Sequence, residues 1–247
     1  MPSQLVHVPR TASSTLIKQS PLFSSLPADL LTDVAGHFAL QSWKKNELID
    51  PDILLTRFHY ILDGQLEYKR SNPDTGREVS IDMLYPGDSF DIVTLLDGKP
   101  RDMMISPITD IRVISIPIET MRKWIWTYPR LNRQFLPYFA QKMREYEDQT
   151  SSFVLYDIQT RLSRLILKHL NKIHFYRGHS DEAHKKHLIN GLSDEVLARM
   201  VGSVRQVVNK QLKHWQTQGI LNKKRNQIMI NDLETLAKEA KQTASYY

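Results

Sequence analysis

The sequence predicts an α+β protein made of a strand-rich N-terminal part, a long helix and a C-terminal helix pair followed by a β-hairpin. Three observations predict this order. Short apolar or alternating runs interrupted by Gly64, Gly76, Gly87 and Gly98 are typical of strands joined by turns. A stretch without glycine then shows a heptad spacing over 132–156. Beyond it, a helix-turn-helix pattern precedes two short strand-like runs.

Strand signals fill the first half of the chain. One apolar run ends in the turn Asp63-Gly64, and an alternating run leads towards a second turn that ends at Asp88. Several antiparallel strands at this spacing indicate a β-barrel or jelly roll, which we assign to 21–131, after an N-terminal lead over 1–20. The expected strands are Phe58–Leu62, Gln65–Lys69, Arg77–Leu84 and Ile111–Ile116.

A long helix is predicted over 132–156, which lacks glycine and has no proline after Pro137. Its large side chains recur at alternating steps of four and three residues, the pattern of a helix seam. The seam packs either on the β-rich domain or on a second copy of the helix. We favour a dimer, because helix-turn-helix proteins commonly bind two half-sites symmetrically. The seam residues are Phe139, Met143, Tyr146, Thr150 and Phe153.

Residues 192–210 predict a helix-turn-helix inside a C-terminal domain that spans 157–247. Ala198 is small enough for two helices to cross, Gly202 makes the turn, and an apolar residue packs the second helix onto the first. A capping box between a serine and the glutamine three residues later is expected to start the second helix. The capping pair is Ser203 and Gln206, and the side chains expected to face inward are Val204, Val207 or Val208, and Leu212.

That start, just before Arg205, turns four polar side chains of the second helix outward. Arginine can hold guanine O6 and N7 through two hydrogen bonds, and glutamine or asparagine can hold adenine N6 and N7. The candidates for base reading are therefore Arg205, Gln206, Asn209 and Lys210. The alternative is an ordinary helix pair with a solvated basic face. Gln211, at a position usually apolar in this motif, keeps that alternative open.

A β-hairpin wing is expected after the second helix. Two strand-like runs, Gly219–Leu221 and Gln227–Ile230, are joined by the basic turn 222–226. Basic side chains at a wing tip would contact phosphates and add affinity without reading sequence, and a solvated loop is the alternative. The candidate phosphate contacts of the whole motif are Ser193, Ser203, Lys213, Lys223, Lys224 and Arg225.

The positive charge is concentrated at the C-terminal end. From Asp157 to Tyr247 the chain carries 16 Lys and Arg against 8 Asp and Glu, whereas the first 156 residues carry 17 against 19. A concentrated positive field favours a polyanion such as nucleic acid. In the same region no amphipathic helix combines lysines with exposed large apolar residues, so a membrane partner is not expected.

Several classes of protein are excluded or disfavoured. The chain has no cysteine, and so neither disulfides nor thiolate-held iron–sulfur clusters. It has no signal-peptide core and no apolar run near the ~20 residues that span a bilayer, so we expect it in the cytoplasm. No nucleophile elbow, phosphate loop or zinc-hydrolase pattern is present, and the chain is not expected to be an enzyme.

Neither a cofactor nor a metal is expected. Histidines are scattered between His169 and His187, a region whose role the sequence leaves open. The spacing His184-x-x-His187 is a weak ligand signal, so a mobile surface connection is favoured over a metal site. Haem binding would rest on an isolated histidine such as His59, and isolated histidines are usually structural.

The order of these parts resembles the cyclic-AMP receptor protein and fumarate–nitrate regulator (CRP/FNR) family of bacterial transcription factors over almost the whole chain. The resemblance implies a β-roll effector domain like those that bind cyclic nucleotides, a dimerisation helix and a winged helix. It also implies that Arg205, Gln206 and Lys210 occupy base-reading positions. The segments that carry it are Pro21–Pro27, Tyr60–Gly64, Tyr85–Asp88, the long helix ending at Asp157, Val201–Arg205 and Asn231–Ala237.

The effector pocket departs from the cyclic-nucleotide-binding members of that family. By the resemblance, Ile92 stands where a ribose-binding glutamate is expected, and Asp102 replaces a small residue beside Arg101. A carboxylate next to the arginine opposes a phosphate as strongly as the arginine attracts it, so an Arg101–Asp102 pair is favoured over phosphate binding. If the alignment slips by one residue, Asp91 becomes the ribose acid. The β-roll interior near Ile92 is either a filled core or an apolar pocket.

We therefore expect a homodimeric regulator that binds a pseudo-palindromic site on double-stranded DNA, with RNA polymerase as a candidate further partner. Its cyclic-nucleotide pocket is expected to be degenerate and not to bind cyclic AMP, and no effector is identified. Two alternatives stay open. One is a cyclic-nucleotide-responsive activator in which Asp91 and Arg101 hold the ligand. The other is a nucleotide-sensing subunit that regulates a protein partner.

Overall fold

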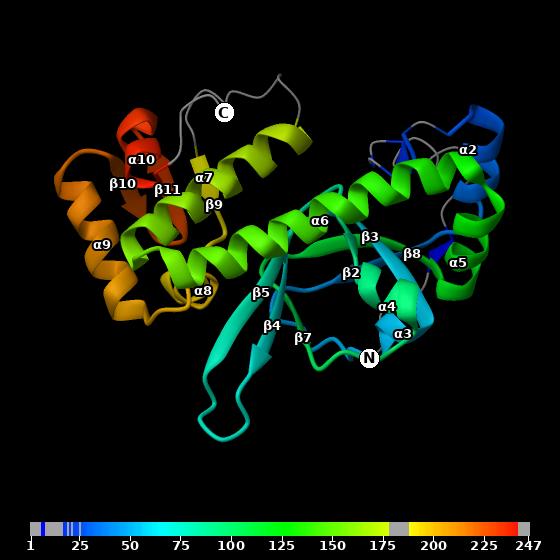
Figure 1. Ribbon diagram of the computed structural model, residues 1–247, viewed down its shortest axis with the longest axis horizontal. Helices are drawn as coiled ribbons and strands as arrows, with labels where there is room; N and C mark the ends of the chain where they lie inside the picture. Colours follow the sequence, from blue (N-terminus) through cyan, green and yellow to red (C-terminus); the bar gives the residue numbers. More distant parts are fainter. Residues whose placement is uncertain are drawn as a thin grey trace. The chain divides into compact units, whose positions relative to one another are not determined.

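The structure is a computed structural model that describes residues 6–7, 17–18, 20, 22–24, 26–177 and 188–241. The chain divides into two compact units, and most of their elements are labelled in Figure 1. The first comprises Met1–Lys69 and Met83–Glu147. The second comprises Arg70–Asp82 and Asp148–Tyr247. The α+β class is confirmed, since both units contain helices and strands.

Two antiparallel sheets form the β-roll and confirm the predicted strand-rich domain. The larger has the order β1-β2-β8-β3-β6, and the smaller has the order β5-β4-β7. Gly64 follows β3 with φ 90°, and a Cβ there would lie 2.4 Å from the carbonyl oxygen of Asp110, so only glycine fits this turn. The strands are β1 Val6–His7, β2 Ala39–Trp43, β3 Arg57–Asp63, β4 Leu66–Ser71, β5 Glu78–Leu84, β6 Ser89–Phe90, β7 Met104–Pro107 and β8 Ile111–Pro117.

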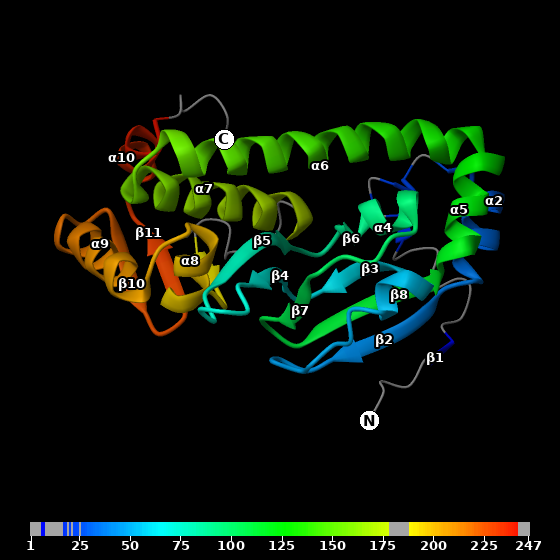
Figure 2. The same cartoon turned by 60° about the horizontal axis from the view of Figure 1, so that its bottom comes forward.

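Helices cover one side of this core. The hydrophobic cluster joins Phe58 and Ile116 of the larger sheet to Trp124 of α5 and Phe135 of α6. The long helix begins at Pro129, three residues before the predicted start, and a proline suits the first position of a helix because its missing N–H is not needed there. The helices are α2 Ala28–Ala35, α3 Ile53–Thr56, α4 Ile92–Asp97, α5 Ile118–Thr127 and α6 Pro129–Leu155, the last drawn as one continuous helix in Figure 2.

The second unit contains the C-terminal helices and a small sheet of order β10-β11-β9. Asp157 caps α7, because its Oδ1 accepts a hydrogen bond from the Thr160 amide at 2.8 Å. That bond is the main cause of a lowered pKa of the Asp157 carboxyl. The elements are α7 Ile158–Arg177, β9 Leu188–Asn190, α8 Asp194–Met200, α9 Arg205–Thr217, β10 Leu221–Lys224, β11 Gln227–Ile230 and α10 Leu233–Glu239.

The histidines that the sequence analysis singled out fall partly within the described residues. His169 is fully buried in α7, while His179, His184 and His187 lie outside the described residues. Within the described ranges, no three His, Cys, Asp or Glu side chains gather as metal ligands would. None of the helices that the structure describes is both long and apolar enough to cross a membrane.

Candidate nucleic-acid interface and effector region

The first helix of the predicted motif, α8, starts where the sequence indicated. Ser193 is its N-cap, and the Ser193 Oγ accepts a hydrogen bond from the Val196 amide at 3.3 Å. Gly202 forms the turn in the left-handed region, with φ 63°. A Cβ on Gly202 would lie 3.0 Å from the Phe153 ring, so this glycine is required by backbone conformation and by space.

The second helix, α9, begins at Arg205 as predicted, but the predicted capping box is wrong. Val204 is the N-cap and no side chain caps the helix. Ser203 instead uses its backbone amide, which donates to the Ala198 carbonyl oxygen at 2.8 Å and closes the turn. Ser203 therefore stands one residue too early for its hydroxyl to cap α9, and Gln206 remains exposed.

The faces of α9 separate a buried side from a polar one. Val208, Leu212 and Trp215 are fully buried. The prediction that Val204 faces inward is wrong, because 55% of Val204 and 40% of Val207 are exposed, and of the alternatives Val207 and Val208 only the second lies in the core. The exposed polar side chains of α9 include Arg205, Gln206, Lys210 and Lys213, while Asn209 is half-buried.

Asp194, which the sequence analysis missed, binds two of the candidate DNA contacts, one by a hydrogen bond and one by an ion pair. Asp194 Oδ2 accepts a hydrogen bond from Asn209 Nδ2 at 2.7 Å, and Lys223 Nζ lies 2.5 Å from Asp194 Oδ1. Burial raises the pKa of Asp194, but hydrogen bonds from Lys223 and Asn209 outweigh that effect and lower it. Asp194 therefore connects the wing and the second helix to the start of α8. In the sequence, its position directly after the N-cap Ser193 could have indicated a structural role.

The wing is an antiparallel hairpin, as predicted, and is shown beside α9 in Figure 1. Its register pairs Leu221 with Ile230 and Lys224 with Gln227. The strands extend into the predicted turn, which leaves a two-residue tip that contains Arg225. Lys224 and Arg225 are exposed. The tip and the last residue of β10 therefore present two of the three basic side chains predicted there, since Lys223 is held by Asp194.

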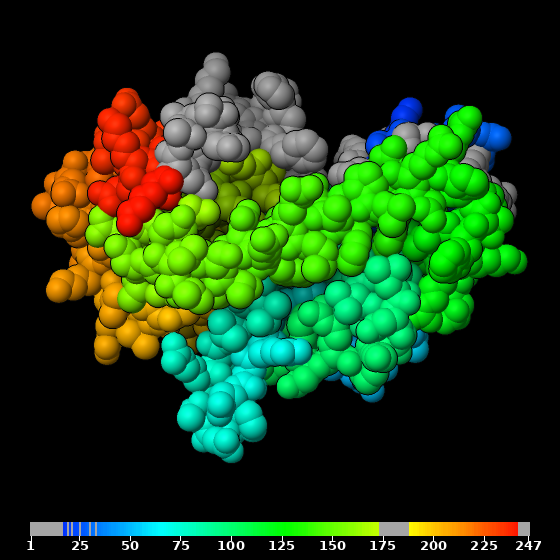
Figure 3. All heavy atoms as spheres, in the orientation of Figure 1, coloured from blue at the N-terminus to red at the C-terminus, as the bar shows by residue number. Residues whose placement is uncertain are grey.

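The predicted helix seam is only partly accessible on α6. Met143 and Thr150 are exposed, whereas Phe139, Tyr146 and Phe153 are half-buried. The Phe153 ring also lies 5.5 Å from the Arg161 guanidinium. A second stripe with the same heptad steps, which shares Met143 and Thr150 with the predicted seam, is exposed throughout. It lies on the long helix whose surface is visible in Figure 3. This α6 stripe consists of Leu136, Ala140, Met143, Glu147, Thr150 and Val154.

In the effector region Arg101 forms an ion pair, but with a different partner from the predicted one. Arg101 Nη1 lies 2.9 Å from Asp91 Oδ1, and the Asp91 side chain is 2% exposed. The prediction of an Arg101–Asp102 pair is corrected, because the turn after α4 brings Arg101 back to the residue that caps this helix. Burial lowers the pKa of Arg101, but hydrogen bonding and charge attraction to Asp91 outweigh it and raise it. Ile92 is buried in the hydrophobic core.

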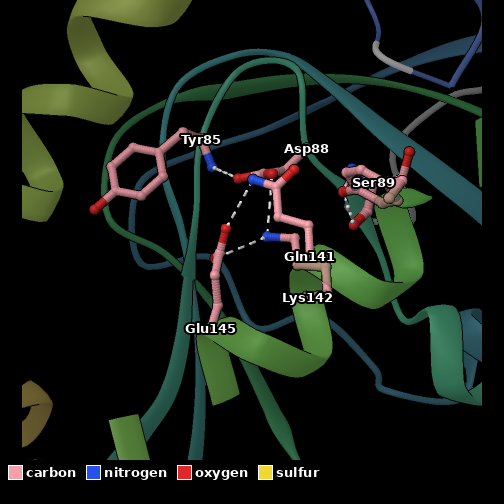
Figure 4. Close-up of polar contacts among 7 residues, drawn as sticks. Tyr85, Asp88, Ser89, Gln141, Lys142 and Glu145 are labelled. Atoms are coloured by element: carbon pink, nitrogen blue, oxygen red, sulfur yellow. Dashed lines mark hydrogen bonds and ion pairs between the residues drawn. The ribbon is translucent and has the colours of Figure 1, made fainter. Parts of the chain in front are cut away.

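A buried charged cluster, which no sequence signal announced, connects α6 with the turn after β5 (Figure 4). Lys142 Nζ lies 3.1 Å from Asp88 Oδ1 and 3.7 Å from Glu145 Oε2, and the Asp88 side chain is fully buried. Asp88 Oδ2 also accepts a hydrogen bond from the Tyr85 amide at 3.1 Å. The neighbouring Ser89 amide donates to the Tyr138 hydroxyl at 2.9 Å. The long helix thus holds the turn that leads into the effector region.

His59 has a structural environment. It is fully buried in β3, its ring stacks on Phe90 with centroids 4.8 Å apart, and Trp43 lies on another side. Burial lowers the pKa of His59 to about 3. The imidazole is therefore neutral at physiological pH and forms part of an aromatic core.

Comparisons with known proteins find similar transcription regulators. The Crp-like helix-turn-helix domain matches residues 160–239. A CRP-like cAMP-activated global transcriptional regulator of Mycobacterium tuberculosis is 26% identical over 185 residues, which cover 75% of this chain and 80% of that protein. FixK2 from Bradyrhizobium japonicum has a similar fold, with a TM-score of 0.68 at 18% identity over 84% of this chain and 98% of that one. A CRP/FNR-family regulator from Thermus thermophilus has a TM-score of 0.63 at 20% identity, over 82% and 98% of the two chains.

A β-roll, a long helix and a C-terminal winged helix-turn-helix define a class of DNA-binding transcription regulators, and the relatives are regulators rather than enzymes. Within that class, the chain resembles CRP/FNR regulators, and its residues 160–239 match the Crp-like helix-turn-helix domain.

Proposed function

We propose that this regulator binds DNA sequence-specifically as a homodimer and does not depend on cyclic AMP. The observation that carries the DNA-binding part is the set of exposed polar side chains at the start of α9, next to an exposed basic wing tip. Arg205, Gln206 and Lys210 are assigned to base edges in the major groove. Lys224 and Arg225, with Ser203 and Lys213, are assigned to phosphates.

Three of the earlier candidates receive other roles. Asn209 and Lys223 bind Asp194, which keeps α8, α9 and the wing together. Ser193 caps α8 through its hydroxyl. We infer that these residues preserve the shape of the DNA-binding domain, so their substitution weakens binding to all DNA sequences alike.

The dimer is proposed to form through the α6 stripe. A helix that exposes Leu136, Met143 and Val154 at heptad spacing leaves apolar surface that a second copy of the same helix can cover. Such an isologous contact makes the two recognition helices symmetric. Half-sites are then expected about one helical turn, roughly 34 Å, apart in a pseudo-palindrome. As a regulator of bacterial type, the protein is assigned to the cytoplasm, with RNA polymerase as a candidate partner.

The effector region argues against a cyclic nucleotide. A cyclic phosphate needs an unopposed cation, but Arg101 is held by Asp91, and Ile92 contributes a buried apolar side chain where the family's ribose acid is expected. The second candidate function, a cyclic-nucleotide-responsive activator, is favoured by the name of the Mycobacterium tuberculosis relative. In that case Asp91 would have to release Arg101 to the ligand.

Calorimetric titration with cyclic AMP and cyclic GMP separates the two candidates. We expect no binding heat up to millimolar nucleotide. Micromolar binding that is lost in Arg101→Gln would establish the nucleotide-responsive alternative. Selection of binding sites from random duplex DNA tests the DNA-binding proposal, because a sequence-specific dimer enriches a motif with two-fold symmetry.

A further inference from the structure

Two exposed valines flank the base-reading side chains at the start of α9. Val204, the N-cap, is 55% exposed, and Val207 in the first turn is 40% exposed. They are three residues apart, so they are neighbours on one face of the helix start. Arg205 and Gln206 lie between them in sequence, and Lys210 follows Val207 by one turn. The recognition surface therefore contains a small apolar strip among hydrogen-bonding groups.

The valines are not needed for the core on this side of the helix. Val208, the adjacent residue, is fully buried and packs α9 together with Leu212 and Trp215. Isolated exposed apolar residues are common on protein surfaces. Here, however, both lie on the surface that the proposed function turns towards DNA, and the surrounding exposed side chains carry positive charge or amides. A strip of two valines is also too small to hold a protein partner.

We propose, on the basis of the proposed function, that Val204 and Val207 contact thymine methyl groups in the major groove. These contacts make the two valines specificity-determining residues. The C5-methyl of thymine is the one apolar group that the four bases present in that groove. Valine offers methyl groups but no hydrogen bond, so it can distinguish thymine from cytosine through this contact alone. Each half-site then contains at least one thymine adjacent to the pairs read by Arg205 and Gln206.

The test removes the methyl groups from DNA and from protein separately. The full-length protein first selects a site from random duplex DNA, and each thymine of that site is then replaced by deoxyuracil, which lacks only the methyl. Loss of one buried methyl is expected to weaken binding about three- to fivefold at one or two positions per half-site. The Val204→Ala and Val207→Ala variants should be insensitive to the replacement at the position each residue contacts. Val207→Ile should stay sensitive.

Controls keep the inference separate from the proposed function. Leu48→Ala truncates an apolar side chain that is 97% exposed in the first unit, and its sensitivity to deoxyuracil should equal that of the unmodified protein. If a symmetric motif is selected but no deoxyuracil weakens binding, the methyl contact is refuted while the DNA-binding proposal stands. The same holds if Val204→Ala and Val207→Ala remain fully sensitive. If no motif is enriched at all, the proposed function itself fails, and this inference with it.

Discussion

Replacing Lys142 with methionine should destabilise the β-roll severely, because it removes a cation from a buried cluster. Lys142 Nζ lies 3.1 Å from Asp88 Oδ1, so the attraction at an effective dielectric of 20 is about 5 kcal/mol. Dehydration of both groups offsets much of that gain. The variant loses the attraction but keeps the buried carboxylate, and breaking such a pair costs about 3–5 kcal/mol.

Urea unfolding at fixed protein concentration measures this loss. In a Trp215→Phe background, fluorescence reports on the three tryptophans of the first unit, of which Trp43 and Trp124 are 2% and 6% exposed and Trp126 is 84% exposed. Fixed concentration is needed because dimerisation contributes to apparent stability. Lys123→Met is the matched control, since Lys123 is an exposed lysine on α5, and it should change the free energy of unfolding by less than about 0.5 kcal/mol.

A double-mutant cycle decides whether the pair with Asp88 is the cause. Asp88→Asn removes the charge and keeps an oxygen for the Tyr85 amide. Lys142→Met combined with Asp88→Asn should cost at least about 1 kcal/mol less than the sum of the single changes. A loss below about 1 kcal/mol for Lys142→Met, or strictly additive losses, would refute the reasoning.

Three further outcomes are expected. Arg205→Ala should weaken specific binding by about 1–3 kcal/mol and relax the base preference at one base pair per half-site. Lys224→Ala should weaken binding to all duplexes alike and reduce the dependence of affinity on salt concentration. Binding titrations on selected and random DNA distinguish the two variants, and identical behaviour would contradict the assigned roles. His59 has a folded pKa of about 3, below its ordinary 6.5, so its neutral form contributes stability that is complete above pH 6.5 and is lost as pH falls towards 3. Urea unfolding between pH 7 and 4 should therefore show a slope of up to about 1.4 kcal/mol per pH unit from this residue, and His59→Phe should reduce that slope; an unchanged slope would exclude His59 as its source. Met143→Glu puts like charges on the α6 stripe of both copies and should shift the species seen in sedimentation towards monomer. Arg144→Glu, at an exposed neighbouring position, is the control. A dimer that persists in Met143→Glu would place the interface elsewhere.

The start of the recognition helix shows which structural features can be predicted from neighbouring residues in the sequence. Its start at Arg205 and the turn at Gly202 follow from residues a few positions apart, because a left-handed φ and a helix boundary depend on neighbours in the chain. The same rules erred by one residue at the cap, where Val204 took the position assigned to Ser203. They also missed the exposure of Val204, since burial depends on what packs above a residue.

The predicted seam illustrates a different limit. Heptad spacing correctly indicated a long helix, but two adjacent stripes of α6 satisfy the same spacing. Phe153 belongs to one stripe by sequence, yet its ring faces the turn at Gly202. Only the arrangement of the surrounding elements leaves Met143 and Thr150, which both stripes share, exposed and makes Phe139, Tyr146 and Phe153 half-buried.

Strand and helix order, the helix-turn-helix and the basic wing could be derived from the amino-acid sequence, since periodicity, glycine positions and charge are local properties. The partners of the charged side chains could not be derived from the sequence. Asp91 with Arg101, Asp88 with Lys142 and Asp194 with Lys223 are 10, 54 and 29 residues apart. A charge pairs with whatever the fold brings within about 4 Å of it. The tertiary structure alone therefore decided which cations remain available to DNA and which hold the protein together.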